Sequence, residues 1–124
     1  MEDGSSVKDE GSSRLPGSYG GFRGLQEEFQ AYQRAAFPER EPRFFALELC
    51  GEAGELANLE KKAWKGRAVD EARFADEAAD VVIAILNYAN ARGVDLSEAV
   101  SEKMAKIDRI RLEEGGGRSE PPDA

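Results

Sequence analysis

The chain of 124 residues contains no histidine and only one cysteine. The absence of histidine excludes Ser-His-Asp and Cys-His catalysis, histidine general bases, and zinc or iron sites with histidine ligands. A single cysteine cannot form an internal disulfide, and the apolar sequence around Cys50 predicts that it is buried as a small hydrophobic residue. Any chemistry therefore has to use carboxylates, lysines, hydroxyl groups or a metal ion.

Long apolar segments and an excess of positive charge are also missing. The longest strongly apolar run, 81–86, is far shorter than the ~20 residues that span a bilayer, and the N-terminus has no apolar signal stretch. The 17 Lys and Arg are outnumbered by 25 Asp and Glu, which gives a net charge of −8. This charge disfavours nucleic acids and anionic lipids as partners. We expect a cytoplasmic protein that binds small ligands or cations, with no nucleic-acid or membrane partner.

The two ends of the chain differ in composition from its centre. Residues 1–24 are rich in glycine and serine, and residues 114–124 combine three glycines with two prolines. Such segments bury too little apolar surface to offset the entropy lost on ordering. We therefore predict disordered tails at 1–24 and 114–124 around one folded domain at 25–113. A chain of this size can hold a core without disulfides.

Four helical patterns and no strand alternation predict an all-α fold. The predicted helices cover about 25–37, 43–64 and 71–91, with a fourth that starts after Asp95. Asp70 and Asp95 are placed to cap the third and fourth helices, and Gly66 and Gly93 to end the second and third. The apolar stripes expected to face the core are, in the first helix, Leu25, Phe29, Tyr32 and Ala36; in the second, Phe45, Leu49, Ala53, Leu56, Leu59 and Ala63; and in the fourth, Leu96, Val100, Met104 and Ile107.

The third helix is apolar on every side over residues 81–86. A helix of this kind has to be covered all round, and three short partners from one chain do not suffice. The sequence therefore predicts a four-helix bundle-type fold that is completed by homo-oligomerisation.

Acidic residues gather on one face of the second and third helices. Glu48, Glu52 and Glu55 are spaced as surface neighbours, and so are Glu77 and Asp80. Like charges at this spacing weaken a helix unless a cation neutralises them, and Mg²⁺ prefers carboxylate oxygens. Gly51 and Gly54 lie within the same helix at a cost of roughly 1 kcal/mol each relative to alanine, which predicts a close approach there.

These residues also carry a resemblance to a known family. The segment 48–57, ELCGEAGELA, followed by 76–82, DEAADVV, resembles the MazG-like branch of the all-α nucleoside triphosphate pyrophosphohydrolases, over about 25–112. The resemblance implies hydrolysis of a nucleoside triphosphate to the monophosphate and pyrophosphate by a homodimer or homotetramer. It implies Mg²⁺, with Mn²⁺ as a possible substitute, on Glu52, Glu55, Glu77 and Asp80. Glu52 or Glu55 would help to deprotonate the attacking water.

The sequence departs from the family pattern at two positions. Many relatives have a glutamate where this chain has Gly51, for which Glu48 is a candidate substitute, and an asparagine near Ala105. Basic residues follow the first motif and recur on the last helix, and Trp64 is a candidate either for stacking on a base or for packing. The candidate substrate-binding residues are Glu48, Lys62, Trp64, Lys65, Lys103 and Lys106.

Two other functions remain open from the sequence. One is a helical oligomerisation or regulatory module without catalysis, which the departures at Gly51 and Ala105 would suit. The other is an activity like that of phosphoribosyl-ATP pyrophosphohydrolase, which uses a similar helical scaffold.

Overall fold

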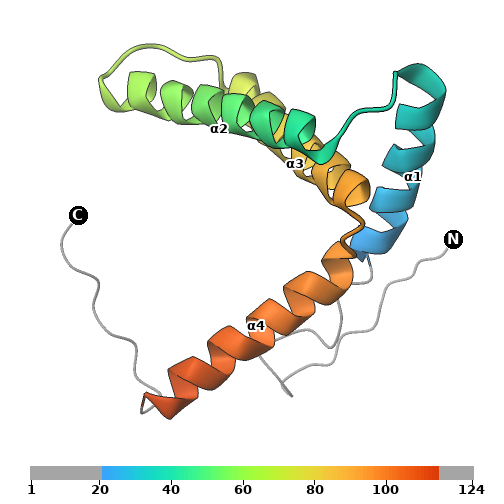
Figure 1. Cartoon of the computed structure of the whole chain (residues 1–124). Coiled ribbons are helices and arrows are strands. Elements are labelled where there is room, and N and C mark those ends of the chain that lie inside the picture. Colours follow the sequence, from blue (N-terminus) through green and yellow to red (C-terminus); the bar gives the residue numbers. More distant parts are fainter. Residues whose placement is uncertain (1–20, 115–124) are drawn as a thin grey trace, which may run out of the picture.

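The structure, a computed structural model, describes residues 21–114, which form four helices and no strand (Figure 1). The helices are α1 (Gly21–Ala36), α2 (Pro42–Trp64), α3 (Glu71–Arg92) and α4 (Leu96–Glu113). The prediction of an all-α fold is confirmed. Helix α1 begins at Gly21, ahead of the predicted domain start at Leu25, and the rest of the predicted tails lies outside the described residues, apart from Glu114.

The helix ends are set by short-range signals that the sequence contains. The side chain of Asp70 accepts a hydrogen bond from Ala72 N at 3.1 Å, and that of Asp95 accepts one from Glu98 N at 3.2 Å. These bonds satisfy amide groups that have no partner within the first helical turn. Gly93 follows α3 in the left-handed conformation, with φ of 79°, and Gly66 follows α2 with φ of 83°. The predicted caps and terminating glycines are therefore confirmed.

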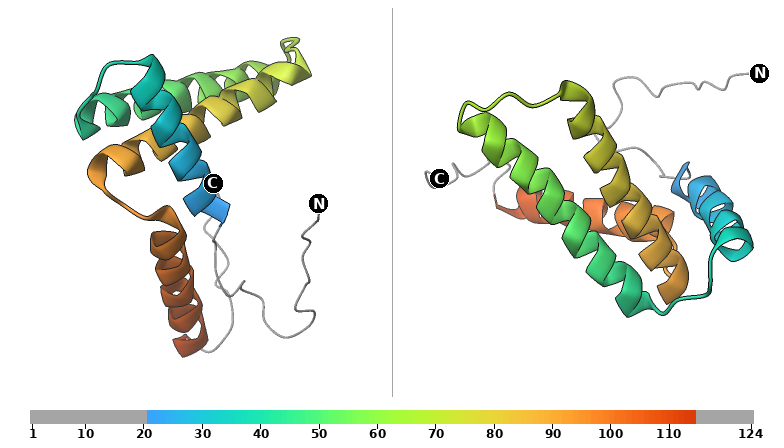
Figure 2. Two further views of the ribbon diagram at one scale, coloured as in Figure 1. Left: turned by 90° about the vertical axis from the view of Figure 1, so that its right-hand side faces the viewer. Right: turned by 90° about the horizontal axis from the view of Figure 1, so that it is seen from above.

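Helices α2 and α3 form an antiparallel hairpin that contains most of the core (Figures 1 and 2). Phe45 and Leu59 of α2 are buried, as are Ala84, Leu86 and Ala89 of α3. The apolar run of α3 is not covered all round, because the side chain of Val82 remains 47% exposed. The hairpin thus fixes the relative positions of two long helices and leaves one outer face open.

Helix α1 is attached to α3 by a buried glutamine, and of the predicted apolar stripe only Phe29 is half-buried. Leu25, Tyr32 and Ala36 of that stripe are exposed, whereas Gln26 is buried. Both polar ends of the Gln26 side chain are hydrogen-bonded. This explains how an amide can take a core position.

Gln26 also fixes the turn between α3 and α4. Its Nε2 donates to Asn90 Oδ1 at 3.1 Å and to the Val94 carbonyl at 2.8 Å, and its Oε1 accepts from Leu96 N at 2.8 Å. Asn90 Nδ2 in turn donates to the Gln26 carbonyl at 2.9 Å. One side chain therefore joins three helices.

Helix α4 extends away from the α2–α3 hairpin and contacts α1 near its start (Figure 2). Its predicted stripe is only partly covered within this chain, since Ile107 is exposed, and so is Ile110, which lies one turn beyond the stripe. The helix passes outside the hairpin because Gln26 and the ion pair between Arg23 and Asp95, at 2.7 Å, hold its first turn against α1. One chain therefore does not close a four-helix bundle over the described residues.

Two further predictions on α2 are wrong. Cys50 is exposed, because it lies on the side of α2 that faces away from α3. The close approach expected at Gly51 and Gly54 is absent among residues 21–114, since a Cβ added at either glycine would meet no atom within 4 Å beyond its chain neighbours and the nearby backbone of its own helix. Among residues 21–114, no helix has the length and apolar character needed to cross a membrane.

Replacing Gln26 with alanine should destabilise the fold. The substitution leaves Leu96 N and the Val94 carbonyl without their partner, so we expect a loss of about 1 to 3 kcal/mol in the free energy of unfolding, measured by urea denaturation. Gln30→Ala, one turn later on the same helix, is the matched control and should change it by less than about 0.5 kcal/mol. Equal losses for the two variants would contradict the role of Gln26.

Candidate metal centre

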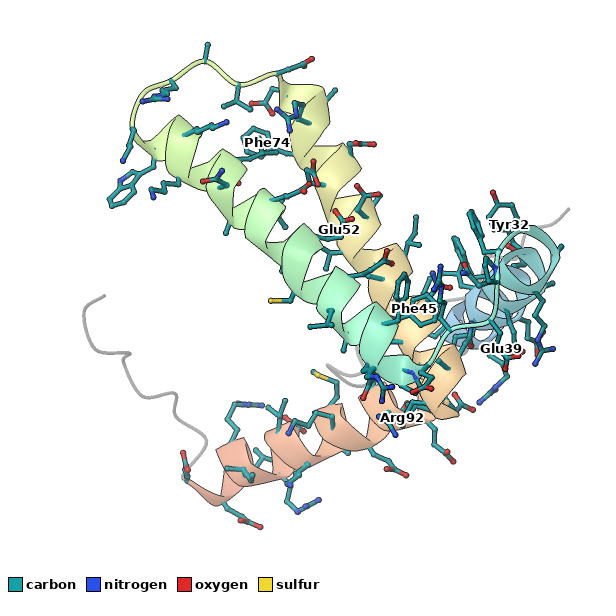
Figure 3. All side chains as sticks on the ribbon, turned by 45° about the horizontal axis from the view of Figure 1, so that its top comes forward. Tyr32, Glu39, Phe45, Glu52, Phe74 and Arg92 are labelled. Atoms are coloured by element: carbon teal, nitrogen blue, oxygen red, sulfur yellow. The ribbon has the colours of Figure 1, made fainter. Side chains whose placement is uncertain are left out.

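The antiparallel pairing of α2 and α3 brings together the acidic residues of the two motifs. Carboxylate oxygens of Glu52, Glu55 and Glu77 lie within 4.8 Å of one another, and so do oxygens of Asp76, Glu77 and Asp80. Figure 3 shows Glu52 on α2 beside α3. Glu77 belongs to both groups and links them. The four acids predicted as metal ligands therefore fall in two overlapping groups that share Glu77, and Asp76 joins the second group.

Glu77 is the least exposed of these acids, with only 7% of its surface accessible. Its Oε2 lies 3.6 Å from Arg73 Nη2, but its Oε1 has no hydrogen-bond partner among the described residues. Burial of a carboxylate oxygen without a partner is costly, and such atoms are rare in folded proteins. A cation bound between the two helices would supply the missing partner.

Glu52 experiences the combined charge of the cluster. Partial burial raises the pKa of its carboxyl group above the ordinary value, and the negative charges of Asp80, Glu55, Glu77 and Glu48 raise it further. Each effect disfavours the ionised form. The ionised cluster therefore repels itself unless positive charge is placed among the carboxylates.

The residues present fit Mg²⁺ better than a softer metal. The cluster offers carboxylate oxygens alone, whereas zinc and iron sites normally use histidine or cysteine, and the chain has no histidine. Two oxygens on opposite sides of Mg²⁺ are about 4.2 Å apart, given metal–oxygen distances near 2.1 Å. The separation of up to 4.8 Å within each group is close to this value.

The predicted substrate-binding residues are not gathered in the same way. Glu48 lies one turn before Glu52 and lines a hollow beside Phe45. Trp64 is 86% exposed, and its position nine residues after Glu55 places it on the opposite side of α2. The four lysines are exposed, two of them at the end of α2 and two on α4, which does not pack along α2: Lys62, Lys65, Lys103 and Lys106.

Asp76 is a member of the cluster that sequence reasoning missed. It precedes Asp80 by four residues, so the two lie on the same face of α3. That spacing is visible in the sequence, but the paired motif includes only Glu77 and Asp80 of this helix.

In comparisons with known proteins, no family model matches the chain, and no curated protein or solved structure matches it. The assignment of the centre therefore depends on the chemistry of the residues themselves.

The raised pKa of Glu52 predicts how stability depends on pH. Because the folded state keeps this proton to higher pH than the unfolded chain, Glu52 contributes stability below its unfolded pKa of about 4.3, and the contribution is lost as the pH rises through the raised pKa. In metal-free buffer we expect Glu52→Gln to have a higher Tm than wild type near neutral pH, and the difference to disappear toward about pH 4.

Adding Mg²⁺ should raise the Tm of the wild type near neutral pH and raise that of Glu52→Gln much less, because the variant has lost one carboxylate ligand. Glu60→Gln, which removes an exposed acid of α2 outside the cluster, is the matched control and should respond to Mg²⁺ as the wild type does. A wild-type Tm that is independent of Mg²⁺ would count against the metal centre.

Proposed function

We propose that the protein is a Mg²⁺-dependent nucleoside triphosphate pyrophosphohydrolase that forms a nucleoside monophosphate and pyrophosphate. The observation that carries the proposal is the buried Glu77, whose Oε1 lacks a partner at the centre of carboxylates from two helices. The resemblance of the two acidic motifs to the MazG-like enzymes gives this centre a reaction. The two overlapping groups of carboxylates, which bring Glu52 and Glu55 beside Glu77 and Glu77 beside Asp80, support the proposal, because a metal held by both motifs requires them to be close.

Mg²⁺ would be held by Glu52, Glu55, Glu77 and Asp80, and when bound it neutralises charge on the triphosphate and polarises the scissile phosphoryl group. The chain's own carboxylates position the attacking water. The oxygen of that water forms a bond to the α-phosphorus, the bond from the α-phosphorus to the bridging oxygen breaks, and pyrophosphate leaves. Either Glu52 or Glu55 would accept the proton of that water.

The activity is tested by measuring pyrophosphate release from a panel of canonical and modified nucleoside triphosphates, with and without Mg²⁺. We expect Mg²⁺-dependent turnover, and a decrease in kcat/KM of at least about 100-fold for Glu52→Gln and for Glu55→Gln, as for the loss of a general base. Glu60→Gln should retain the wild-type rate. The absence of turnover by the wild type would refute the proposal, and so would full activity of the double variant Glu52→Gln, Glu55→Gln.

We also propose that the protein is a homo-oligomer, because one chain leaves apolar surface on two helices. Helix α4 exposes Ile107 and Ile110, and the outer side of α2 exposes Leu47 and Cys50. Exposed helical faces of this kind are usually covered by another surface. In a homodimer or homotetramer, another copy of the chain would bury α4 in a bundle that one chain does not complete.

The oligomer predicts that a charge within the α4 stripe is disruptive. Ile107→Glu should dissociate the assembly, as measured by light scattering coupled to size-exclusion chromatography, because it places a carboxylate in the buried interface. Ala105→Glu introduces the same side chain on the opposite side of α4 and should leave the assembly intact. A wild-type monomer at all concentrations would contradict this proposal without affecting the proposed metal centre.

A further inference from the structure

A cleft lies between the C-terminal half of α1, the loop 37–41 and α3. Its volume is about 540 Å³, and Arg34, Phe37, Arg40, Phe45 and Asn87 are among its lining residues. A second hollow of about 320 Å³ shares Phe37, Phe45 and Asn87 and extends to Glu48, one turn from the acidic cluster. Figure 3 shows Phe45 at the end of α2 that lies nearest Tyr32 of α1 and Glu39 of the following loop. The combined space is of the size that small-molecule sites occupy.

Asn87 is the polar residue of the cleft with an unsatisfied buried group. Its side chain is only 8% exposed, and its Oδ1 has no hydrogen-bond partner among the described residues. Asn90, one turn later, lines the same cleft but is fully engaged with Gln26. A buried carbonyl oxygen without a partner costs stability, so its presence beside a cleft indicates that a ligand supplies the partner.

Helices α2 and α3 both connect the cleft to the acidic cluster, so the distance between the two is fixed. Phe45 precedes Glu52 by two helical turns on α2, and Asn87 follows Asp80 by two turns on α3. Because the two helices are antiparallel, both steps lead toward the same end of the hairpin, by about 10 Å. This is comparable to the reach from the α-phosphate of a nucleotide, across the sugar, to the base.

We propose that this cleft receives the base of the nucleotide and that Asn87 Oδ1 accepts a hydrogen bond from an exocyclic amino group of that base. The inference builds on the proposed pyrophosphohydrolase function and names its preferred substrates as nucleotides whose base bears an exocyclic amino group. Phe37 and Phe45 supply the apolar walls that a planar base requires. The Arg40 guanidinium, which lies 4.5 Å from the centre of the Phe44 ring, borders the opening.

Two pairs of ligands that differ at the amino group test the role of Asn87. We expect AMP to bind roughly tenfold more tightly than IMP, and CMP roughly tenfold more tightly than UMP, as measured by isothermal titration of the full chain. The same order should hold for kcat/KM with the corresponding triphosphates. Equal affinities within both pairs, or no binding of any of the four monophosphates, would overturn the assignment.

Variants separate the hydrogen bond from general effects on folding. Asn87→Leu removes the acceptor and should abolish the preference within each pair, while its Tm is retained because an unpartnered polar atom has been replaced. Asn87→Asp keeps an acceptor at the same place and should retain the preference for the amino-bearing base. Asn58→Leu, on the exposed surface of α2, is the matched control and should leave both affinity and preference unchanged. A preference that survives in Asn87→Leu would refute the proposal.

The outcomes also distinguish this inference from the function on which it depends. Selective binding of AMP and CMP without pyrophosphate release from any triphosphate would retain the cleft and reject the pyrophosphohydrolase. Turnover that requires Glu52 and Glu55 but does not discriminate within either pair would retain the enzyme and reject the role of Asn87.

Discussion

The arrangement of this molecule depends on the antiparallel packing of α2 against α3. Phe45 and Leu59 on one helix and Ala84 and Leu86 on the other are buried in this contact, which fixes the register of the two helices. That register places Glu52 and Glu55 opposite Glu77, although mutual repulsion opposes the approach of these carboxylates. The burial of the apolar residues therefore holds the acids in an arrangement that they would not adopt by themselves.

A protein can maintain such an unfavourable cluster only if other contacts stabilise the scaffold. Here the apolar contacts flank the acids along the hairpin, with Leu59 on one side and Phe45 on the other. The hydrogen bonds of Gln26 add a second constraint, because they tie α1 and the start of α4 to the C-terminal end of α3. The repulsion between the carboxylates is concentrated in the region between these two sets of contacts, where a bound cation would reduce it.

Local features of the fold could be predicted from the sequence, whereas tertiary ones could not. The caps at Asp70 and Asp95 and the left-handed Gly93 follow from bonds and backbone preferences within a few residues, so the sequence contains all the information they need. The burial of Gln26 and the exposure of Cys50 depend on which helices meet and at what angle. Helical periodicity does not determine which helices meet. The prediction that Cys50 is buried is therefore wrong, and the burial of Gln26 was not predicted.

The same distinction applies to the candidate centre. Spacing of three or four residues places the acids on one face of each helix, and only the packing of α2 on α3 shows that the two faces meet at Glu77. The sequence near Asn87 does not indicate a binding role, because an asparagine that follows an apolar run can equally well be a solvated residue. Its significance follows from burial, an unpartnered oxygen and the adjacent cleft, which are all tertiary properties.

The acidic cluster and the cleft share the same two helices, which under the proposed function would link base specificity to catalysis. A base that fills the cleft contacts α3 two turns from Asp80 and borders Phe45, two turns from Glu52. An α-helix keeps residues two turns apart at a fixed distance, because each backbone hydrogen bond fixes the rise between successive turns. A base seated against Asn87 would thus hold its α-phosphate within reach of the carboxylates, whereas a base without the matching donor leaves the Asn87 oxygen unpaired and binds less tightly. Under the proposed function, discrimination between bases needs no moving part, only the rigid register of the α2–α3 hairpin.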